Sequence, residues 1–395
     1  MTSPALIHAI TPGDHFSPRT GSAIPTVVHA LASAALAAGD PRHAVLLDRS
    51  TYRPRYGSAE VIEYDSAPQP DALARRLDVI RGRLGGSRPG IAAHYRPLAD
   101  ALQDRPPSIV LAHNAPVLVR LLRDSDHLPV LYAHNNLLRT YSRREAGRML
   151  DGAAGIVCVS ESLAQATRAQ LPGRLADLVR VVHNGADVDR FHPADPSGVD
   201  RGGDDHDARA VRVLFIGRMI PDKGADVLVR AAAMLHDPRL EVVIVGSAGF
   251  ARDLPLTPFE QSLRALAANS ATRIRFEPFT ARDALPGLMA GADVFVIPSR
   301  WPDPCPLTVG EGLAAGLPLI ASRVGGIPEI AGPSSLLVAP DDPAALARAI
   351  DSLVHDPALR RRLGAASRAH AESHDGAWAW RTLRGALADL AAPGR

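Results

Sequence analysis

The chain has 395 residues, a length that fits two domains of ordinary size, with 46% hydrophobic residues, 22% charged residues and a formal net charge of +2. This balance is typical of a globular protein. It excludes the strong basic field of a nucleic-acid-binding domain, although local peripheral contact with an anionic membrane surface stays open. No apolar run reaches the roughly 18 residues that a membrane-spanning helix needs, so no span is expected.

The chain carries only two cysteines, Cys158 and Cys305, too few for a disulfide framework or a cysteine-rich metal cluster. Their scarcity predicts a reducing, cytoplasmic setting. Cys158 lies in an apolar run and is predicted to be core, whereas Cys305 lies in a polar loop, where packing and thiol reactivity both stay open. Residues 1–17 lack a positive region and a long apolar core, so no signal peptide is expected.

The first 50 residues alternate between strand and helix patterns. An apolar run at 5–10 predicts a strand, a helix with one apolar face is predicted at 26–38, and a second strand at 44–47. This βαβ opening is typical of a doubly wound parallel sheet. The loop at 11–25 is long for such a connection, so it is either a functional loop or an ordinary surface loop.

Residues 52–105 are the least regular segment, and they predict only one helix, at 71–84, before a Gly-rich break at 85–90. Two apolar strands are then predicted at 108–112 and 129–133, and each ends in a His-Asn pair. A single such histidine would more often be a satisfied structural residue. His113 and His134 follow successive strands, however, so a structural role and a functional role both stay open for them.

Two further strands, at 156–159 and 179–182, lead to the end of the first predicted domain. Ser160 and Glu161 predict a capped helix after the first of these strands, and the turn-forming pair Asn184 and Gly185 follows the second. Residues 195–210 are rich in Gly and Asp without apolar periodicity, which predicts a flexible linker.

The second domain is predicted to begin with a strand at 211–216. The loop after it, GRMIPDKG, carries Arg218 and Lys223, and a helix is predicted at 225–235. Lys223 is the only lysine in the chain. Two cations at the carboxyl end of a strand are either solvated surface charges or part of an anion-binding site.

The rest of the second domain continues the alternation of strands and helices. Strands are predicted at 240–245 (before Gly246), 273–276 (before the loop 278–280) and 336–338, and helices at 285–290, 342–354, 359–372 and 377–390. The last helix carries Trp378 and Trp380, which are predicted to pack rather than to act in catalysis.

The stretch 294–329 organises this domain. It predicts a buried strand at 294–297, a polar loop at 299–306, a helix at 308–315 and a second strand at 317–321. Such a loop lies at the carboxyl end of its strand, and the amides that begin the helix suit a phosphate. Asp303 and Glu311 could both face one ligand there; alternatively, Asp303 caps the helix and Glu311 is a solvated helix residue.

This stretch resembles the signature of the retaining glycosyltransferases of family 4 (glycosyltransferase group 1). The family pattern is Glu, seven residues, Glu, then a Gly-Gly-x-Pro-Glu segment. Asp303 stands in place of the first Glu, Glu311 matches the second, and residues 325–329 match the later segment. Two departures stand out: Asp303 is one methylene shorter than Glu, and Pro306 replaces a Gly and so removes one amide donor.

The resemblance implies an α/β chain with the GT-B fold, in which two Rossmann-like, doubly wound domains face each other across a cleft. The implied parts are an acceptor-side domain at 1–194, the linker at 195–210, a nucleotide-sugar-binding domain at 211–375 and a terminal helix at 376–395 that crosses back to the first domain. Acceptor-facing loops in 52–105 follow by analogy of fold alone.

The resemblance also implies roles for individual residues. Catalytic roles are implied for His134, Arg218, Lys223 and Asp303. Donor-binding roles are implied for Gly21, Arg218, Lys223, Gly246, Phe279, Asp303, Leu307, Thr308 and Glu311. Acceptor-side roles are implied for Arg19, Thr20 and His113. The resemblance implies no metal and no cofactor, because the nucleotide sugar is itself a substrate.

The activity that the resemblance implies is transfer of a hexose-type sugar from a nucleoside-diphosphate sugar to a hydroxyl acceptor, with retention at the anomeric carbon. Family frequency favours a UDP-sugar, and a bacterial glycan or a specialised metabolite would be the acceptor. The alternatives are a nucleotide-sugar epimerase of the same fold and, because of Asp303 and Pro306, a non-catalytic nucleotide-sugar-binding protein.

Overall fold

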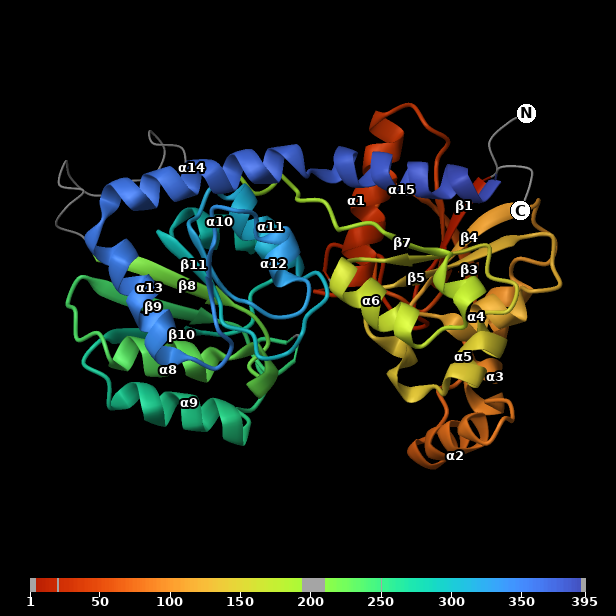
Figure 1. Cartoon of the computed structure of the whole chain (residues 1–395), viewed down its shortest axis with the longest axis horizontal. Coiled ribbons are helices and arrows are strands. Elements are labelled where there is room, and N and C mark those ends of the chain that lie inside the picture. Colours follow the sequence, from red (N-terminus) through yellow and green to blue (C-terminus); the bar gives the residue numbers. More distant parts are fainter. Residues whose placement is uncertain (1–4, 20, 194–209, 250, 392–395) are drawn as a thin grey trace. The chain divides into compact units, whose positions relative to one another are not determined.

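The computed structural model describes residues 5–19, 21–193, 210–249 and 251–391, with side chains up to 388 (Figure 1). The chain divides into two compact units. Unit 1 comprises Met1–Gly185 and Gly376–Arg395, and unit 2 comprises Ala186–Asp375. The predicted linker lies outside the described residues except for Ala210, and so does Thr20.

Unit 1 is built on a seven-stranded sheet of order β3-β2-β1-β4-β5-β6-β7, in which every pair is parallel. The strands are β1 (Ala5–Ala9), β2 (Ala44–Asp48), β3 (Glu60–Tyr64), β4 (Ser108–His113), β5 (Leu128–Ala133), β6 (Gly155–Cys158) and β7 (Val179–Val181). The helices are α1 (Ala23–Ala37), α2 (Ala72–Arg83), α3 (Pro89–Asp100), α4 (Pro116–Leu121), α5 (Arg143–Met149), α6 (Glu161–Ala169), α7 (Gly173–Ala176) and α15 (Gly376–Ala391), with a 3-10 turn, η1 (Leu137–Thr140).

Burial explains why the strands of unit 1 are so apolar. All six residues of β4 are buried, because a central parallel strand has helices on both of its faces. The terminal helix α15 packs along α1, and the indole Nε1 of Trp380 donates a hydrogen bond to Asp40 Oδ2 at 2.7 Å. Cys158 is buried, as expected, and burial raises the pKa of its thiol to about 11.

The differences between unit 1 and the sequence-based expectation include the start of α1, the edge strand β3 and the helices α3, α4 and α5. Helix α1 begins at Ala23, so that Pro25 lies in its first turn, where a missing N–H costs nothing. The edge strand β3 was not predicted, because its polar residues alternate with buried ones. Helix α3 was also not predicted; it has no side-chain cap and carries Pro97 in its interior.

Unit 2 is built on a six-stranded, all-parallel sheet of order β10-β9-β8-β11-β12-β13. The strands are β8 (Val211–Ile216), β9 (Leu240–Val245), β10 (Arg273–Glu277), β11 (Val294–Ile297), β12 (Leu319–Ser322) and β13 (Leu336–Val338). The helices are α8 (Ala225–Ala233), α9 (Pro258–Ala268), α10 (Leu285–Ala290), α11 (Leu307–Ala314), α12 (Ile327–Ile330), α13 (Pro343–His355) and α14 (Pro357–Ser373), with 3-10 turns η2 (Pro221–Lys223) and η3 (Arg282–Ala284).

The sheet of unit 2 has a hydrophobic core on each face. Val213 and Phe215 of β8 pack with α8, α9 and α13, whereas Leu214, between them, packs with α10 and α11 on the other face. This doubly wound arrangement confirms the predicted α/β fold class. The strand order reverses between β8 and β11, so the loops that follow these two strands flank a topological switch point, where open α/β sheets bind ligands.

Candidate functional site

Hydrogen bonds join the loops that follow β8 and β11. The carbonyl oxygen of Asp222 accepts the backbone N–H of Arg300 at 2.9 Å and that of Trp301 at 3.1 Å, and also the hydroxyl of Ser299 at 3.2 Å. Gly224 has a φ of +72°, and a Cβ there would lie 1.9 Å from the carbonyl oxygen of Pro298. The two loops therefore touch at the backbone, and only glycine fits at this contact.

Two residues of the predicted site meet between these loops. Lys223 Nζ lies 2.5 Å from Asp303 Oδ2, and the two side chains are 26% and 18% exposed. Asp303 therefore does not cap helix α11, since its carboxylate pairs with the lysine of the neighbouring loop. A half-buried, charge-assisted pair of this kind holds both groups at the carboxyl edge of the sheet.

Arg300 holds the base of the same loop in place, and this residue was not identified from the sequence. Its guanidinium donates to both carboxylate oxygens of Asp226, at 2.6 and 2.7 Å, to Asp341 at 2.7 Å and to the carbonyl of Pro221 at 3.0 Å. Burial raises the pKa of Asp226, but the hydrogen bonds from Arg300 outweigh that effect and leave the pKa below its ordinary value. The ion pair thus ties the β11 loop to the first turn of α8.

Helix α11 begins beside the Lys223–Asp303 pair without a side-chain cap. Its N-cap residue is Pro306, and the first turn contains no acidic residue. Leu307 and Thr308 are half-buried, and their amides are among those that have no partner within the helix. The helix therefore keeps amide donors and the positive end of its dipole available for an anion.

Glu311 is 3% exposed, so it is not a solvated helix residue. Arg282, in η3, lies 2.6 Å from Glu311 Oε1 as an ion pair, yet neither oxygen of Glu311 has a well-aligned hydrogen-bond donor among the described residues. The guanidinium carbon of Arg282 lies 5.8 Å from the ring centroid of the buried Phe191. Arg282 was not identified from the sequence, because an arginine in a polar loop gives no local signal of its partner.

Gly246, Phe279 and Arg218 complete the predicted donor set in unit 2. Gly246 has a φ of +140°, and a Cβ there would lie 2.0 Å from the carbonyl oxygen of Gly217, so the loops after β8 and β9 also touch at a glycine. Phe279 follows β10 and is half-buried. Arg218 is exposed, and no hydrogen bond or ion pair joins its side chain to any other described residue.

In unit 1, four imidazoles form an unbroken chain of hydrogen bonds across the sheet. His134 Nε2 lies 2.8 Å from His113 Nδ1, His113 Nε2 lies 2.9 Å from His8 Nδ1, and His8 Nε2 lies 3.0 Å from His43 Nδ1. Burial lowers the pKa of all four, to about 3 for His134 and about 4 for His43. Of these, His8 and His43 were not identified from the sequence.

The chain of imidazoles ends at His134, whose backbone N–H is bound by the side chain of Asn114 in the loop after β4. Asn114 has a φ of +53°, and its side-chain oxygen accepts the backbone N–H of His134 at 2.8 Å. Tyr132 stacks on His134 with ring centroids 4.7 Å apart. His113 is fully buried, whereas Arg19 and Gly21, in the loop after β1, are exposed.

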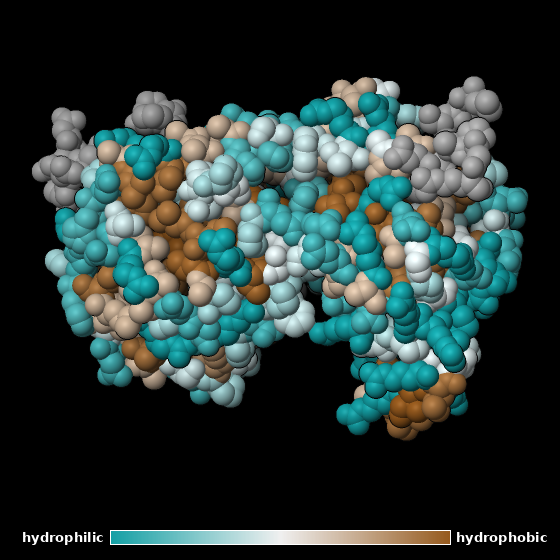
Figure 2. All heavy atoms as spheres, in the orientation of Figure 1, coloured by the Kyte–Doolittle hydropathy of each residue, from teal (hydrophilic) through white to brown (hydrophobic). Residues whose placement is uncertain are grey.

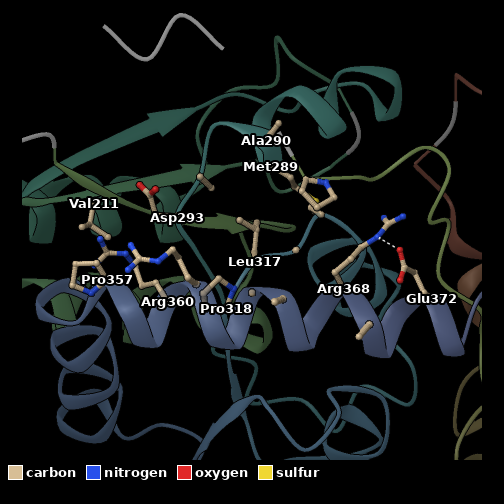
Figure 3. A pocket seen from close by; sticks show the side chains of 18 of the residues that line it. Val211, Met289, Ala290, Asp293, Leu317, Pro318, Pro357, Arg360, Arg368 and Glu372 are labelled. Carbon is tan, nitrogen blue, oxygen red and sulfur yellow. Dashed lines mark hydrogen bonds and ion pairs between the residues drawn. The ribbon is translucent and has the colours of Figure 1, made fainter. Parts of the chain in front are cut away.

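A pocket of about 750 Å³ lies elsewhere in unit 2 (Figure 3). It is lined by Val211, Asp293 and Pro318, which stand at the amino ends of β8, β11 and β12, and by α14, whose Arg368 bonds to Glu372 at 2.7 Å. This edge of the sheet is opposite to the edge that carries Lys223 and Asp303, so the pocket is not part of the predicted site.

Within residues 5–19, 21–193, 210–249 and 251–391, no group of three or more His, Cys, Asp or Glu residues has the arrangement of a metal site. No helix in the same ranges is long and apolar enough to cross a bilayer.

Two family models match the chain, one in each half. The model described as Glycosyltransferase Family 4 matches residues 24–190, and the model described as Glycosyl transferases group 1 matches residues 201–370. The chain is 37% identical over 225 residues to the D-inositol 3-phosphate glycosyltransferase of Streptomyces scabiei, and this match covers 54% of the chain and 48% of that protein. The chain spans about half the length of the first curated relatives that it matches.

Further similarity extends to a Bacillus subtilis protein and to solved structures. The spore coat protein SA is 29% identical over 265 residues, which cover 64% of the chain and 69% of that protein. HepE of Anabaena, solved with UDP and glucose, has a TM-score of 0.72 at 18% identity, and the match covers 98% of the chain and 99% of HepE.

A sucrose-phosphate synthase of Thermosynechococcus elongatus has a TM-score of 0.74 at 20% identity, over 98% of the chain and 99% of that protein. Likeness at this level of identity shows the fold. The parallel sheets of the two units and the two adjoining family matches agree with it, and the chain belongs to glycosyltransferase group 1 and family 4, with the GT-B fold.

Proposed function

We propose that this chain transfers a hexose-type sugar from a nucleoside-diphosphate sugar to a hydroxyl acceptor, with retention at the anomeric carbon. The observation that carries the proposal is the Lys223–Asp303 pair, which lies at the switch point of unit 2 beside the uncapped start of α11. A UDP-sugar is the favoured donor, since HepE has been solved with UDP and glucose.

The leaving diphosphate is assigned to three groups around this point. When the bond between the anomeric carbon and the phosphate oxygen breaks, negative charge grows on the diphosphate. The ammonium of Lys223, the exposed guanidinium of Arg218 and the amides of Leu307 and Thr308 would stabilise that charge. Arg218 has no carboxylate partner among the described residues. Its guanidinium can therefore pair with a phosphate without breaking an existing ion pair.

The two carboxylates are assigned to hydroxyl groups of the donor. Asp303 accepts hydrogen bonds from the sugar while it orients Lys223 at 2.5 Å. Glu311 accepts hydrogen bonds from the ribose. Its oxygens are buried and have no well-aligned donor among the described residues, which supports this role, because a buried acceptor without a hydrogen bond is strongly stabilised by a new donor. Gly246 and Phe279 are assigned to the nucleotide side of the donor.

In unit 1, His134 is assigned to the transferred sugar. Gly21 is assigned to the donor diphosphate, and Arg19, Thr20 and His113 are assigned to the acceptor side. Because His113 is fully buried, its contribution passes through His134, to which it is hydrogen-bonded. No protein nucleophile, metal or cofactor is part of the proposal.

The test supplies UDP-, GDP-, ADP- and dTDP-glucose together with a panel of acceptors, including inositol phosphate, which occurs in the name of the Streptomyces relatives. We expect nucleoside diphosphate to be released only when an acceptor is present, and a product whose anomeric proton coupling by NMR matches that of the donor. A 2-epimer formed without acceptor would instead support the epimerase. Nucleotide binding without turnover on any acceptor would support the non-catalytic protein.

A further inference from the structure

Helix α2 of unit 1 exposes a row of large apolar side chains. Leu73, Leu77, Ile80 and Leu84 are 67%, 42%, 54% and 84% exposed. Their spacing of four, three and four residues places them on one stripe along the helix. Figure 2 shows this patch as hydrophobic surface at the position of α2, bordered by hydrophilic atoms. An exposed apolar row of this kind indicates a binding surface rather than chance exposure.

The opposite face of α2 is fixed in place by contacts that only small or polar side chains can make. Asp78 is buried, and its Oδ2 accepts the backbone N–H of Ile91 at the start of α3 at 2.9 Å. Gly82 is also buried, and a Cβ there would lie 1.8 Å from Glu145 Oε1, which is paired with Arg88 at 2.6 Å. Because these contacts set the rotation of α2, the leucine row must point away from unit 1.

Arginines border the apolar row on both sides. At 100° per residue, Arg76 and Arg83 fall on one flank of the row and Arg81 falls on the other. These three side chains and that of Arg75 are exposed, and none of them is paired with a carboxylate of the described residues. Elsewhere in unit 1, arginines such as Arg53 and Arg55 share the carboxylate of Glu63.

We propose that α2 is a docking surface for an anionic lipid membrane, in which the helix lies in the plane of the headgroups. The leucine row would enter the boundary between headgroups and acyl chains, and the flanking arginines would bind lipid phosphates. Charge argues against a second copy of this chain as the occupant, since a two-fold contact would bring the same arginines face to face. The proposal stands on α2 and does not depend on the proposed sugar transfer.

The test is co-sedimentation of the full chain with vesicles of phosphatidylcholine, with and without phosphatidylglycerol. We expect binding to the vesicles that contain phosphatidylglycerol, weakening as salt is raised. The paired substitutions Leu77→Ser with Ile80→Ser, and Arg76→Glu with Arg83→Glu, are each expected to lower partitioning at least tenfold. These side chains are exposed, so circular dichroism should show an unchanged fold.

Two control pairs match these changes in exposure and charge. Leu254→Ser with Leu256→Ser removes two leucines of unit 2 that are 43% and 42% exposed, and Arg361→Glu with Arg362→Glu reverses two exposed charges of α14. Both controls should bind as the unchanged chain does. Absence of binding to phosphatidylglycerol vesicles, or equal losses in control and α2 variants, would overturn the proposal.

A second measurement follows the helix itself. Both native cysteines are buried, so Leu84→Cys can be labelled selectively with a polarity-sensitive dye. A blue shift on adding phosphatidylglycerol vesicles would support insertion of this end of α2. If the label does not respond, and sedimentation velocity instead reveals a dimer that the leucine substitutions dissociate, the row is an interface between copies and the membrane proposal is wrong.

Discussion

Lys223, the only lysine of the chain, is paired with Asp303 at 2.5 Å, and it carries the first prediction. Lys223→Ala and Arg218→Ala should each lower kcat by about 100-fold to 1,000-fold, because each removes a positive charge from the departing diphosphate. The substitutions should leave the fold intact, since Arg218 is exposed and Lys223 is only half-buried. Steady-state release of nucleoside diphosphate from the donor measures the effect.

Arg362→Ala is the matched control for this prediction, because it removes an exposed cation of unit 2 on α14, the helix that lines the pocket at the opposite edge of the sheet. Its turnover should equal that of the unchanged chain. If Lys223→Ala and Arg218→Ala also retain near-normal turnover, the assignment of these cations to the diphosphate is wrong.

The four-histidine chain predicts how stability depends on pH. A neutral imidazole has one donor and one acceptor nitrogen, so the tautomer of any one ring fixes the tautomers of all four. Burial lowers the pKa of His43 from 6.5 to about 4, so between these values the unfolded chain binds a proton that the folded chain does not. The stability this histidine contributes is complete above its unfolded pKa and is lost as pH falls toward its folded pKa.

The expected loss for His43 alone is about 2 kcal/mol on acidification to about pH 5, and the other three histidines add losses of the same sign. Urea unfolding at neutral and acidic pH measures this slope. His8→Asn interrupts the chain and should make the slope shallower. A free energy of unfolding that stays constant over this range would contradict neutral, linked imidazoles.

Residues of the candidate site could be identified from the sequence only where the neighbouring residues indicated their position. Lys223 and Asp303 stand in short loops at strand ends, and the family pattern marks both. Arg282 and Arg300 were missed because their partners lie far away in sequence: Arg282 pairs with Glu311, and Arg300 pairs with Asp226. Of the four linked histidines, only His113 and His134 were identified from the sequence. His8 lies inside an apolar strand, and nothing in the neighbouring sequence indicates that it contacts His113.

At the scale of elements, the contact between α2 and α5 predicts a large effect of one methyl group. Gly82→Ala would place a Cβ 1.8 Å from Glu145 Oε1 and 2.9 Å from Arg88 Nε, inside a buried ion pair. Displacing one partner of such a pair should cost roughly 3 kcal/mol or more. The free energy of unfolding, measured by urea denaturation, tests this.

Gly173→Ala, in the same unit, provides the comparison. No atom lies within 4 Å of a Cβ added at Gly173, which begins α7. This change should be neutral or slightly stabilising, because alanine restricts the unfolded chain more than glycine does. A Gly82→Ala variant as stable as Gly173→Ala would show that α2 can move away from Glu145.

Elements buried on both sides were the easiest to predict. The strands β8, β9 and β11 match the expected ranges because central parallel strands are continuous apolar runs. The burial of edge strand β3 alternates, and the sequence of α3 contains two prolines, so neither element shows a clear period. Residues 52–105 therefore contain two elements that were not predicted from the sequence, the edge strand β3 and the helix α3, against which α2 packs.

At the scale of the whole chain, the strand order of the two sheets locates the candidate site more clearly than any sequence motif does. In unit 2 the order reverses between β8 and β11, and the loops after those strands carry Lys223 and Asp303. In unit 1 the reversal falls between β1 and β4, the strands of His8 and His113. The sequence predicted two parallel doubly wound sheets, but only the structure shows which loops become neighbours.

Binding of a nucleoside diphosphate to the loops of unit 2 is the central claim, and isothermal titration tests it most directly. We predict that UDP binds at one site per chain, with an affinity at least about tenfold weaker in Lys223→Ala and unchanged in Arg362→Ala. Because Lys223 is the only lysine, UDP should also protect its amine from acylation, which mass spectrometry can follow. An affinity for UDP, GDP, ADP or dTDP that Lys223→Ala leaves unchanged, or no binding of any of them, would contradict the account.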